Sequence, residues 1–158
     1  MSLLPKTPPD AFEKAIRFLA LRPLSEKELL TKLLRAGFPD DECARAVAEC
    51  HKRHYLDDEL LAVDSVSALR QRNLGTRQIK FRLARRGLDM ETVSGLLADE
   101  PQEELAAAIR AMQSKSRLLR NETDERKKRE KLFRFMIGRG FSPEIISRAL
   151  KSAGENGE

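Results

Sequence analysis

The chain contains one short segment three times. The copies read KLLRAGF from Lys32 to Phe38, RLARRGL from Arg82 to Leu88, and FMIGRGF from Phe135 to Phe141, at offsets of 50 and then 53 residues. Apolar residues coincide at the same offsets on both sides: Leu29 with Ile79 and Leu132, Cys43 with Val93 and Ile146, and Val47 with Leu97 and Leu150. This period predicts a tandem array of like units. An array favours an extended surface for gripping a polymer over a closed catalytic cleft.

The composition indicates that these units are helical. Of the 158 residues, 35% are charged and 5% are aromatic, with no Trp. The prominent residues are Leu, Ala, Arg, Glu and Lys, which favour helices, whereas β-branched residues are few. We therefore predict an all-α protein.

Capping signals divide the first copy into three helices. Asp10 is positioned to cap a first helix, which Pro23 ends. Ser25 and Glu28 form an S-x-x-E capping box for a second helix. Gly37 occupies the left-handed position beyond the end of that helix. A third helix opens within residues 39–41.

The second and third copies repeat this order. In the second copy, Thr76 caps a short helix and Asp89 caps the one after it. In the third copy, a longer first helix spans about residues 103–120 and a basic helix follows. Ser142 and Pro143 then form an N-cap and N1 pair for the last helix.

The fold class that follows is all-α, an elongated tandem array of three three-helix modules. We predict module limits at residues 9–55, 56–99 and 101–152. Residues 1–8 and 153–158 lack apolar periodicity, so we expect them to be disordered. A unit of roughly 50 residues buries little surface, so the modules are expected to stabilise one another at their junctions.

Three motifs occur in an order and spacing typical of one protein family. The pattern A-x-x-x-L-A-x-R-x-x-S-x-x-E-L-x-x-K-L runs from Ala15 to Leu33. The run Tyr55-Leu56-Asp57-Asp58-Glu59 follows, and the stretch from Gly75 to Gly87 fits G-x-x-x-I-x-x-x-L-x-x-x-G. Together they resemble the RecX family of bacterial recombination regulators. The likeness covers about residues 11–152, and Asn73-Leu74 departs from a family loop that is commonly basic and rich in glycine.

The resemblance implies a non-enzymatic regulator of the RecA recombinase. Proteins of this family bind along the helical groove of RecA filaments on DNA and restrain filament growth, ATP turnover and strand exchange. Some of them also bind DNA. The resemblance therefore implies the RecA filament as partner of a monomeric chain, with single- or double-stranded DNA as a further partner through phosphate contacts.

The charge distribution indicates a candidate binding surface in the second module. The formal net charge is +5, and the sequence from Arg70 to Arg86 carries seven basic residues and no acidic one. A helical wheel places three arginines of the helix beginning at Thr76 on one arc beside its apolar stripe. Guanidinium groups there suit phosphates or the carboxylates of a protein partner, and a solvated face is the alternative. The predicted basic patch comprises Arg70, Arg72, Arg77, Lys80, Arg82, Arg85 and Arg86.

A second basic run lies in the third module. A basic helix beside the turn at residues 121–124 suits contact with a phosphate backbone. It equally fits an exposed face that is paired with Glu122, Glu125 and Glu130. Its cations are Arg126, Lys127, Lys128, Arg129, Lys131 and Arg134.

The run from Tyr55 to Asp58 is expected at the junction of the first two modules. Tyr55 and Leu56 would fill that junction, and Asp57 and Asp58 would cap the next helix. We favour this structural interpretation over a binding role.

The cysteine and histidine spacing argues against a metal site. Cys43 and Cys50 lie about 10.5 Å apart along one helix, at roughly 1.5 Å per residue. A disulfide spans at most about 7 Å between Cα atoms, and two helical turns are too far for ligands of one zinc ion. His51 and His54 do not improve this geometry. We expect no metal and no disulfide between these cysteines.

Motifs of known enzymes are missing from the sequence. It contains no phosphate loop, no dinucleotide-binding glycine fingerprint and no nucleophile elbow. We therefore expect no enzymatic activity and no cofactor. No apolar run approaches the length of a membrane span, and the N-terminus has no signal-peptide core, so we expect a cytoplasmic protein.

Two other kinds of function fit the same residues. The first is a helical DNA-binding protein whose helix-turn-helix-like modules contact the phosphate backbone. The second is a structural adaptor without effect on RecA. Arg82, Arg85 and Arg86 suit phosphates or an acidic protein, and the same face lacks the Asn or Ser side chains that would read base edges.

The glycine at the second helix stop supplies a test of the repeat. Because a β-branched residue is strained at positive φ, Gly87→Val should lower the stability by about 1–2 kcal/mol. Thermal unfolding followed by circular dichroism measures this change. A variant as stable as the parent would show that the helix stop is misplaced.

Overall fold

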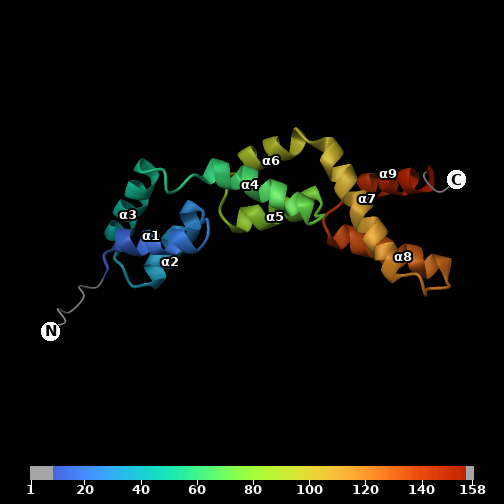
Figure 1. Cartoon of the computed structure of the whole chain (residues 1–158), viewed down its shortest axis with the longest axis horizontal. Helices are drawn as coiled ribbons and strands as arrows, with labels where there is room; N and C mark the ends of the chain where they lie inside the picture. The colour runs from blue at the N-terminus through green and yellow to red at the C-terminus, as the bar shows by residue number, and fades with distance from the viewer. Residues whose placement is uncertain (1–8, 156–158) are drawn as a thin grey trace. The chain divides into compact units, whose positions relative to one another are not determined.

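The structure, a computed structural model, describes residues 9–155 of the chain. This part of the chain contains nine α-helices and no strand, which confirms the predicted all-α fold. Figure 1 shows the helices in order along the chain. They are α1 (Ala11–Leu21), α2 (Glu26–Arg35), α3 (Asp40–Lys52), α4 (Asp58–Gln71), α5 (Thr76–Arg85), α6 (Met90–Ala98), α7 (Pro101–Leu118), α8 (Glu125–Gly138) and α9 (Pro143–Glu155).

Contacts divide the described chain into two compact units. The first unit contains the residues up to Leu61 together with Arg86–Leu88, and the second contains Ala62–Arg85 and the chain from Asp89 onward. In the first unit α1, α2 and α3 pack on one another. In the second unit α5 packs on α6, and α7, α8 and α9 form a three-helix bundle.

The three predicted modules do not coincide with these two units, and their limits stay a prediction. The second and third predicted modules both contribute to the second unit, and the boundary between units falls within α4. Helix α9 continues to Glu155, so the first three residues of the tail predicted to be disordered are helical. Residues 1–8 and 156–158 lie outside the described residues.

The predicted caps of the first unit are present. Asp10 accepts a hydrogen bond from the Glu13 amide at 2.8 Å, and α1 ends at Leu21, ahead of Pro23. In the capping box, the Glu28 amide donates to Ser25 Oγ at 3.1 Å, and the Ser25 amide donates to Glu28 Oε2 at 3.0 Å. Local sequence therefore determines where α1 ends and where α2 begins.

The glycine of each repeated segment lies in the left-handed region. Gly37, Gly87 and Gly140 have φ values of 94°, 79° and 93°. After α2, the Phe38 amide donates to the Leu33 carbonyl and the Gly37 amide donates to the Leu34 carbonyl, the pair of bonds that defines a Schellman motif. The corresponding pair follows α8. The helix stops predicted at Gly37 and Gly87 are confirmed, and Gly140 follows α8 with the same left-handed φ.

Each three-helix bundle has its own apolar core. The core of α1, α2 and α3 includes Cys43 and Cys50, both fully buried. The core of α7, α8 and α9 includes Met136 and Phe141. Leu150 departs from the repeat, because it is exposed where the aligned residues of the other copies are buried. It instead lines a cleft of about 370 Å³ between α8 and α9 with Arg129, Leu132, Phe133 and Ile146.

An arginine directly before the glycine anchors the second segment. The guanidinium of Arg86 donates to both carboxylate oxygens of Glu28, at 3.1 and 3.0 Å, and to the Pro23 carbonyl at 3.2 Å. The backbone carbonyl of Arg86 accepts from Ser25 Oγ at 2.5 Å. All four residues belong to the first unit. We call this set the first Arg–Gly joint.

The third segment is anchored in the same way within the second unit. The guanidinium of Arg139 donates to the backbone carbonyls of Asn73, at 2.9 Å, and of Arg72. The backbone carbonyl of Arg139 accepts from the Gly75 amide at 2.8 Å. Arg139 is 53 residues after Arg86, and Gly75 is 50 residues after Ser25, so the repeat offsets relate the two joints. This second Arg–Gly joint places the end of α8 against the start of α5.

The second joint requires glycine at two facing positions. A Cβ on Gly75 would overlap the backbone of Gly140 and Phe141, and a Cβ on Gly140 would overlap the Gln78 amide. Gly75 has an ordinary negative φ, so its requirement comes from close approach and not from backbone strain. The two backbones therefore pack in direct contact.

Adding a methyl group at Gly75 should open this joint. We expect Gly75→Ala to destabilise the second unit by about 1–3 kcal/mol, the usual range for overpacking. Thermal unfolding by circular dichroism measures the effect. The matched control is Gly95→Ala, because a Cβ there meets no atom and alanine favours the helix. Equal stability of the two variants would contradict the close backbone contact.

Candidate interaction surface

Helix α5 separates apolar from cationic side chains. Ile79 and Leu83 are buried beneath it, whereas its outer face is formed by Arg77, Arg82 and Arg85, which are exposed. Lys80 is half-buried. The exposed Arg72 lies just before the loop that leads into α5. The structure thus brings together five of the seven cations predicted for the basic patch, on and beside one helix.

Two contacts from the α7–α9 bundle hold the start of α5 in place. Glu104 of α7 accepts from the Thr76 amide at 2.9 Å, which supplies a negative group at the positive end of the helix dipole. Gln78 donates to the Gly138 carbonyl of α8 at 3.3 Å. Together with the second Arg–Gly joint, these contacts fix the direction in which the cationic face points.

The cations of this face have no acidic partner in the described chain. Helix α5 contains no Asp or Glu, and none of the five cations forms an ion pair with a carboxylate among residues 9–153. Burial lowers the pKa of the neighbouring Arg139, and the positive charges of Arg82 and Arg72 lower that pKa further. The charges of Arg82 and Arg72 therefore act on the guanidinium of the part-buried Arg139. We call Arg72, Arg77, Lys80, Arg82 and Arg85 the α5 cationic face.

Arg70 does not belong to the surface, contrary to the prediction. Its residue is 4% exposed, and its guanidinium donates to the Leu74 carbonyl and to Thr76 Oγ1, both at 3.0 Å. Glu104 lies 3.9 Å away. Burial lowers the pKa of Arg70, and the charge of Glu104 opposes that shift. Its role is to tie α4 to the start of α5, so it is unavailable to a partner.

Arg86 is also removed from the predicted binding surface. The first Arg–Gly joint engages its guanidinium with Glu28 and its carbonyl with Ser25. Burial alone would raise the pKa of the Glu28 carboxyl, but the hydrogen bonds from Arg86 and from the Ser25 amide outweigh it and hold the pKa below its usual value. The ion pair with Arg86 is therefore structural.

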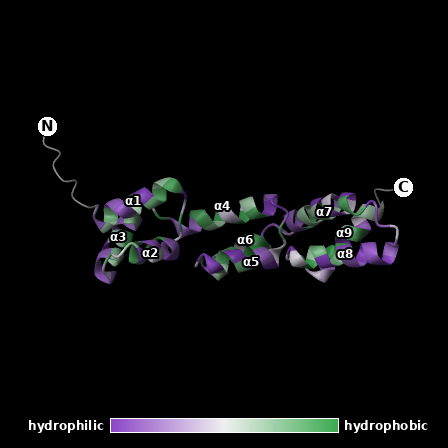
Figure 2. Cartoon of the chain, turned by 90° about the horizontal axis from the view of Figure 1, so that it is seen from below, coloured by the Kyte–Doolittle hydropathy of each residue, from purple (hydrophilic) through white to green (hydrophobic). Residues whose placement is uncertain are grey.

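The basic run of α8 is largely neutralised by its own acidic neighbours. Figure 2 shows the hydrophilic character of its first turns. Four of its six cations form ion pairs, which are Arg126 with Glu130, Lys127 with Asp124, Lys128 with Glu125, and Lys131 with Glu122. Only Arg129 and Arg134 form none within the described chain. The pairing that one of the two alternatives expected is present, and contact of this run with a phosphate backbone stays a prediction.

The junction residues behave differently from one another. Leu56 is buried in the first core, whereas Tyr55 is 51% exposed, so the expectation that Tyr55 fills the junction is wrong. Asp57 accepts from the Leu60 amide at 2.9 Å and caps α4 as expected. Asp58 accepts from the Glu26 amide at 3.0 Å, so it supports the start of α2 instead.

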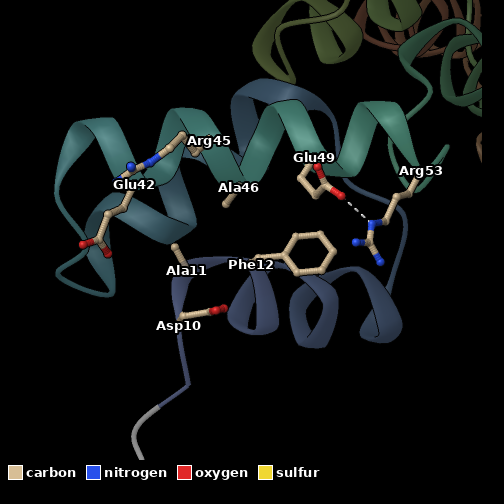
Figure 3. A pocket seen from close by; sticks show the side chains of 8 residues that line it. All are labelled: Asp10, Ala11, Phe12, Glu42, Arg45, Ala46, Glu49 and Arg53. Carbon is tan, nitrogen blue, oxygen red and sulfur yellow. Dashed lines mark hydrogen bonds and ion pairs between the residues drawn. The ribbon is translucent and has the colours of Figure 1, made fainter.

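A shallow hollow of about 470 Å³ lies between α1 and α3 (Figure 3). Three of its charged side chains, Arg45, Glu49 and Arg53, form ion pairs. The Arg53 Nε donates to Glu49 at 2.6 Å, and the Arg53 guanidinium lies 5.0 Å from the centroid of the Phe12 ring. Arg45 pairs with Asp41 at 3.1 Å. The hollow offers an ordinary paired surface, and the α5 cationic face remains the stronger candidate.

The cysteines lie in an environment that does not favour metal binding. Burial raises the pKa of both the Cys43 and the Cys50 thiol, which disfavours the thiolate that a metal requires. Among the described residues, no three His, Cys, Asp or Glu side chains come together closely enough to hold a metal ion. None of the described helices is both long and apolar enough to cross a membrane.

Three residues of the site, Arg139, Glu104 and Phe81, were not identified from the sequence. Arg139 shares a position with Arg86 in the repeat alignment, and this shared position was the available signal. Glu104 is 28 residues from the helix that it caps, so no local pattern reveals it. Phe81 lies on α5 outside the apolar stripe of Ile79 and Leu83 and is 58% exposed. Its exposure could have been inferred from the helical wheel.

The three-helix units and the exposed cationic face define a helical repeat protein with a surface suited to an acidic partner. Residues 11–50 match the model of the first three-helix domain of RecX, and residues 102–150 match the model of its third three-helix domain. These two matches cover the first and the last units of the sequence repeat.

Individual relatives agree with the domain models. The regulatory protein RecX of Legionella pneumophila (strain Corby) is 28% identical over 141 residues, covering 89% of this chain and 93% of that one. The regulatory protein RecX of Chlorobaculum tepidum is 31% identical over 143 residues, covering 90% and 87%. The crystal structure of RecX from Lactobacillus salivarius has the same fold, with a TM-score of 0.78 at 17% identity over 90% and 93% of the two chains. The chain belongs to the RecX family of regulatory proteins.

The Glu28 carboxylate makes the first Arg–Gly joint sensitive to acid. Its pKa is lower in the folded protein than the ordinary value of 4.5, so its stabilisation is present above that value and is lost as the pH falls through the folded pKa. We expect Glu28→Gln to lower the unfolding temperature at pH 7 but to change it little at pH 3. Glu144→Gln, which removes a charge at the exposed start of α9, is the control. If Glu28→Gln lowers the unfolding temperature equally at both pH values, the Glu28 charge does not stabilise the first Arg–Gly joint.

Proposed function

We propose that this chain binds filaments of the RecA recombinase and restrains their extension, ATP turnover and strand exchange. Membership of the RecX family supports the proposal, because regulation of RecA is what a resemblance to that family implies. The residues that we propose make the contact are those of the α5 cationic face, because their charges have no acidic partner in the described chain. This face is the part of the surface best suited to an acidic partner.

The physical basis is electrostatic complementarity supported by several weak contacts. A RecA filament on DNA is a repeating polymer, so successive subunits present the same surface again and again. A chain of tandem modules that holds one subunit raises the effective concentration of its other modules at the next. Unpaired arginines accelerate encounter with an acidic surface and pair bidentately with carboxylates or phosphates. A chain bound in this way occupies surface that the filament needs for turnover and growth.

The same proposal accounts for location and stoichiometry. RecA acts in the bacterial cytoplasm, so we place this protein there. Each chain carries its own α5 cationic face, so a monomer suffices for binding. The function needs no cofactor.

The principal rival is a protein that binds DNA directly through helix-turn-helix-like modules. Its strongest support is that the α5 cationic face also suits phosphates. That face contains arginine and lysine without an exposed Asn or Ser to read a base edge, so it favours contact that is independent of sequence. Naked DNA is therefore included as a separate ligand in the test.

RecA ATP hydrolysis on single-stranded DNA tests the proposal. We expect the wild-type protein to inhibit hydrolysis, and the double variant Arg82→Glu and Arg85→Glu to require about tenfold more protein for the same inhibition at low salt. Arg70 and Arg86 are left intact because their substitution would disturb the core and the first joint. The matched control is Arg126→Glu with Lys127→Glu, the same charge change on the paired face of α8.

The outcomes separate the candidate functions. Inhibition by the wild type with a selective loss in the α5 double variant supports the proposal. A wild-type protein without effect on RecA, which nevertheless binds DNA through α5, would support the DNA-binding rival. Equal losses in the α5 and α8 variants would show that net charge, and not the α5 cationic face, determines binding.

A further inference from the structure

Phe81 is an exposed aromatic residue in the middle of the α5 cationic face. It is 58% exposed, and Arg77 and Arg85 lie one helical turn before and after it. The Arg85 guanidinium lies 5.8 Å from the centroid of the Phe81 ring, a cation–π contact. Ile79 and Leu83 already fill the space beneath the helix. The ring therefore contributes little to the core and is presented outward beside its arginines.

The residue types around Phe81 match the centre of a protein–protein interface. Aromatic residues and arginine are enriched there, whereas lysine, glutamate and aspartate are depleted. The exposed face of α5 combines one phenylalanine with three arginines and has no acidic residue. Helix α8 shows the opposite composition. It also exposes a phenylalanine, Phe133, but that ring lines the cleft between α8 and α9 with Leu132 and Leu150. Four of the six cations of α8 are paired with carboxylates.

We propose that Phe81 is the apolar anchor by which this chain grips a protein partner, entering an apolar pocket whose acidic rim pairs with Arg77 and Arg85. The proposal rests on the proposed function, in which that partner is the RecA filament, and it assigns the chemistry of the contact. The arginines provide attraction and orientation. The ring provides the contact that holds the complex together once water has been expelled from around it.

A protein pocket fits this surface better than single-stranded nucleic acid does. Proteins that bind single strands combine a basic groove with several aromatic side chains, on which successive bases stack. Here one ring stands on the outer side of a single helix, and one of its faces is next to Arg85. It offers a stacking platform for one base at most. Insertion of the ring into a pocket uses its edge and remaining face together.

Substitution of Phe81 tests the assignment in the full-length chain. The measurement is the affinity for RecA filaments assembled on single-stranded DNA, at two salt concentrations. We expect Phe81→Ala to weaken binding at least about tenfold, as for an interface hot spot, and Phe81→Leu to weaken it less. The salt dependence of Phe81→Ala should match the wild type because no charge is removed, whereas Arg85→Ala should bind with a shallower salt dependence.

Phe133→Ala is the matched control, because Phe133 is 47% exposed on α8 and is likewise a phenylalanine. Its affinity should stay within about twofold of the wild type, since Phe133 lies outside the proposed contact and residues away from a hot spot change affinity little. Circular dichroism should show that all variants are folded. Unfolding of Phe81→Ala would overturn the assignment, because an exposed anchor is not needed for the fold.

The remaining outcomes distinguish this inference from the proposed function. If the wild type inhibits RecA and Phe81→Ala binds filaments equally well, the anchor is overturned while the proposed function stands. If the wild type does not bind RecA filaments, both are overturned. If Phe81→Ala weakens binding to a naked single-stranded oligonucleotide as much as to filaments, the ring stacks on a base and the protein pocket is overturned.

Discussion

Each of the two compact units depends on the same interaction, the docking of an Arg–Gly corner onto the start of an earlier helix. The backbone carbonyl of the arginine accepts a hydrogen bond from the residue before that helix, which is Ser25 in one joint and Gly75 in the other. The following glycine turns the chain with a positive φ. Helix starts and ends have backbone groups without intrahelical partners. Each joint lets two such regions satisfy one another.

The guanidinium then reinforces each joint in its own way. Arg86 binds the carboxylate of Glu28, whose other role is in the capping box of α2. Arg139 binds the carbonyls of Arg72 and Asn73, so its partners are backbone groups and not a carboxylate. Removing the Arg86 side chain would take two hydrogen bonds from the part-buried Glu28 carboxylate. Removing the Arg139 side chain would take one from each of the carbonyls of Arg72 and Asn73. The second joint also directs α5, because α5 begins immediately after Gly75. The interaction surface is thus placed by the same contacts that stabilise the second unit.

The sequence also explains why the joint occurs twice and not three times. In the first segment the position of the arginine is taken by Ala36, so the corner has no guanidinium to dock. In the third copy, the position of Ser25 and Gly75 is taken by Lys128, which lies inside α8, because that helix begins earlier and Asp124 caps it. The first copy thus lacks the docking corner and the last copy lacks the receiving site. The two end copies thus differ from the middle copy, as terminal units of repeat arrays commonly do.

Local sequence patterns predicted the helices. They did not predict which basic side chains turn inward, because that depends on contacts between residues far apart in the chain. Capping boxes and left-handed glycines act over four to six residues, so Ser25, Asp89 and Gly140 could be interpreted directly from the sequence. The helical wheel also identified the outer face of α5. It could not show that Arg70 and Arg86 at the two ends of the basic stretch turn inward, because their partners Glu104 and Glu28 are 34 and 58 residues away in the chain. The repeat alignment contained the clue for Arg86, since Arg139 occupies the same position.

The contrast between α5 and α8 shows why the number of basic residues alone does not define a binding surface. Both helices have basic sequences, but α8 pairs four of its six cations with carboxylates of the helix or of the turn before it. Helix α5 has no such residues, and burial together with the charges of Arg82 and Arg72 lowers the pKa of Arg139. An acidic surface brought to α5 would meet cations that have no carboxylate partner in the described chain, whereas at α8 it must compete with existing pairs. Fewer cations without partners therefore attract an acidic partner more strongly than a longer run that is already neutralised.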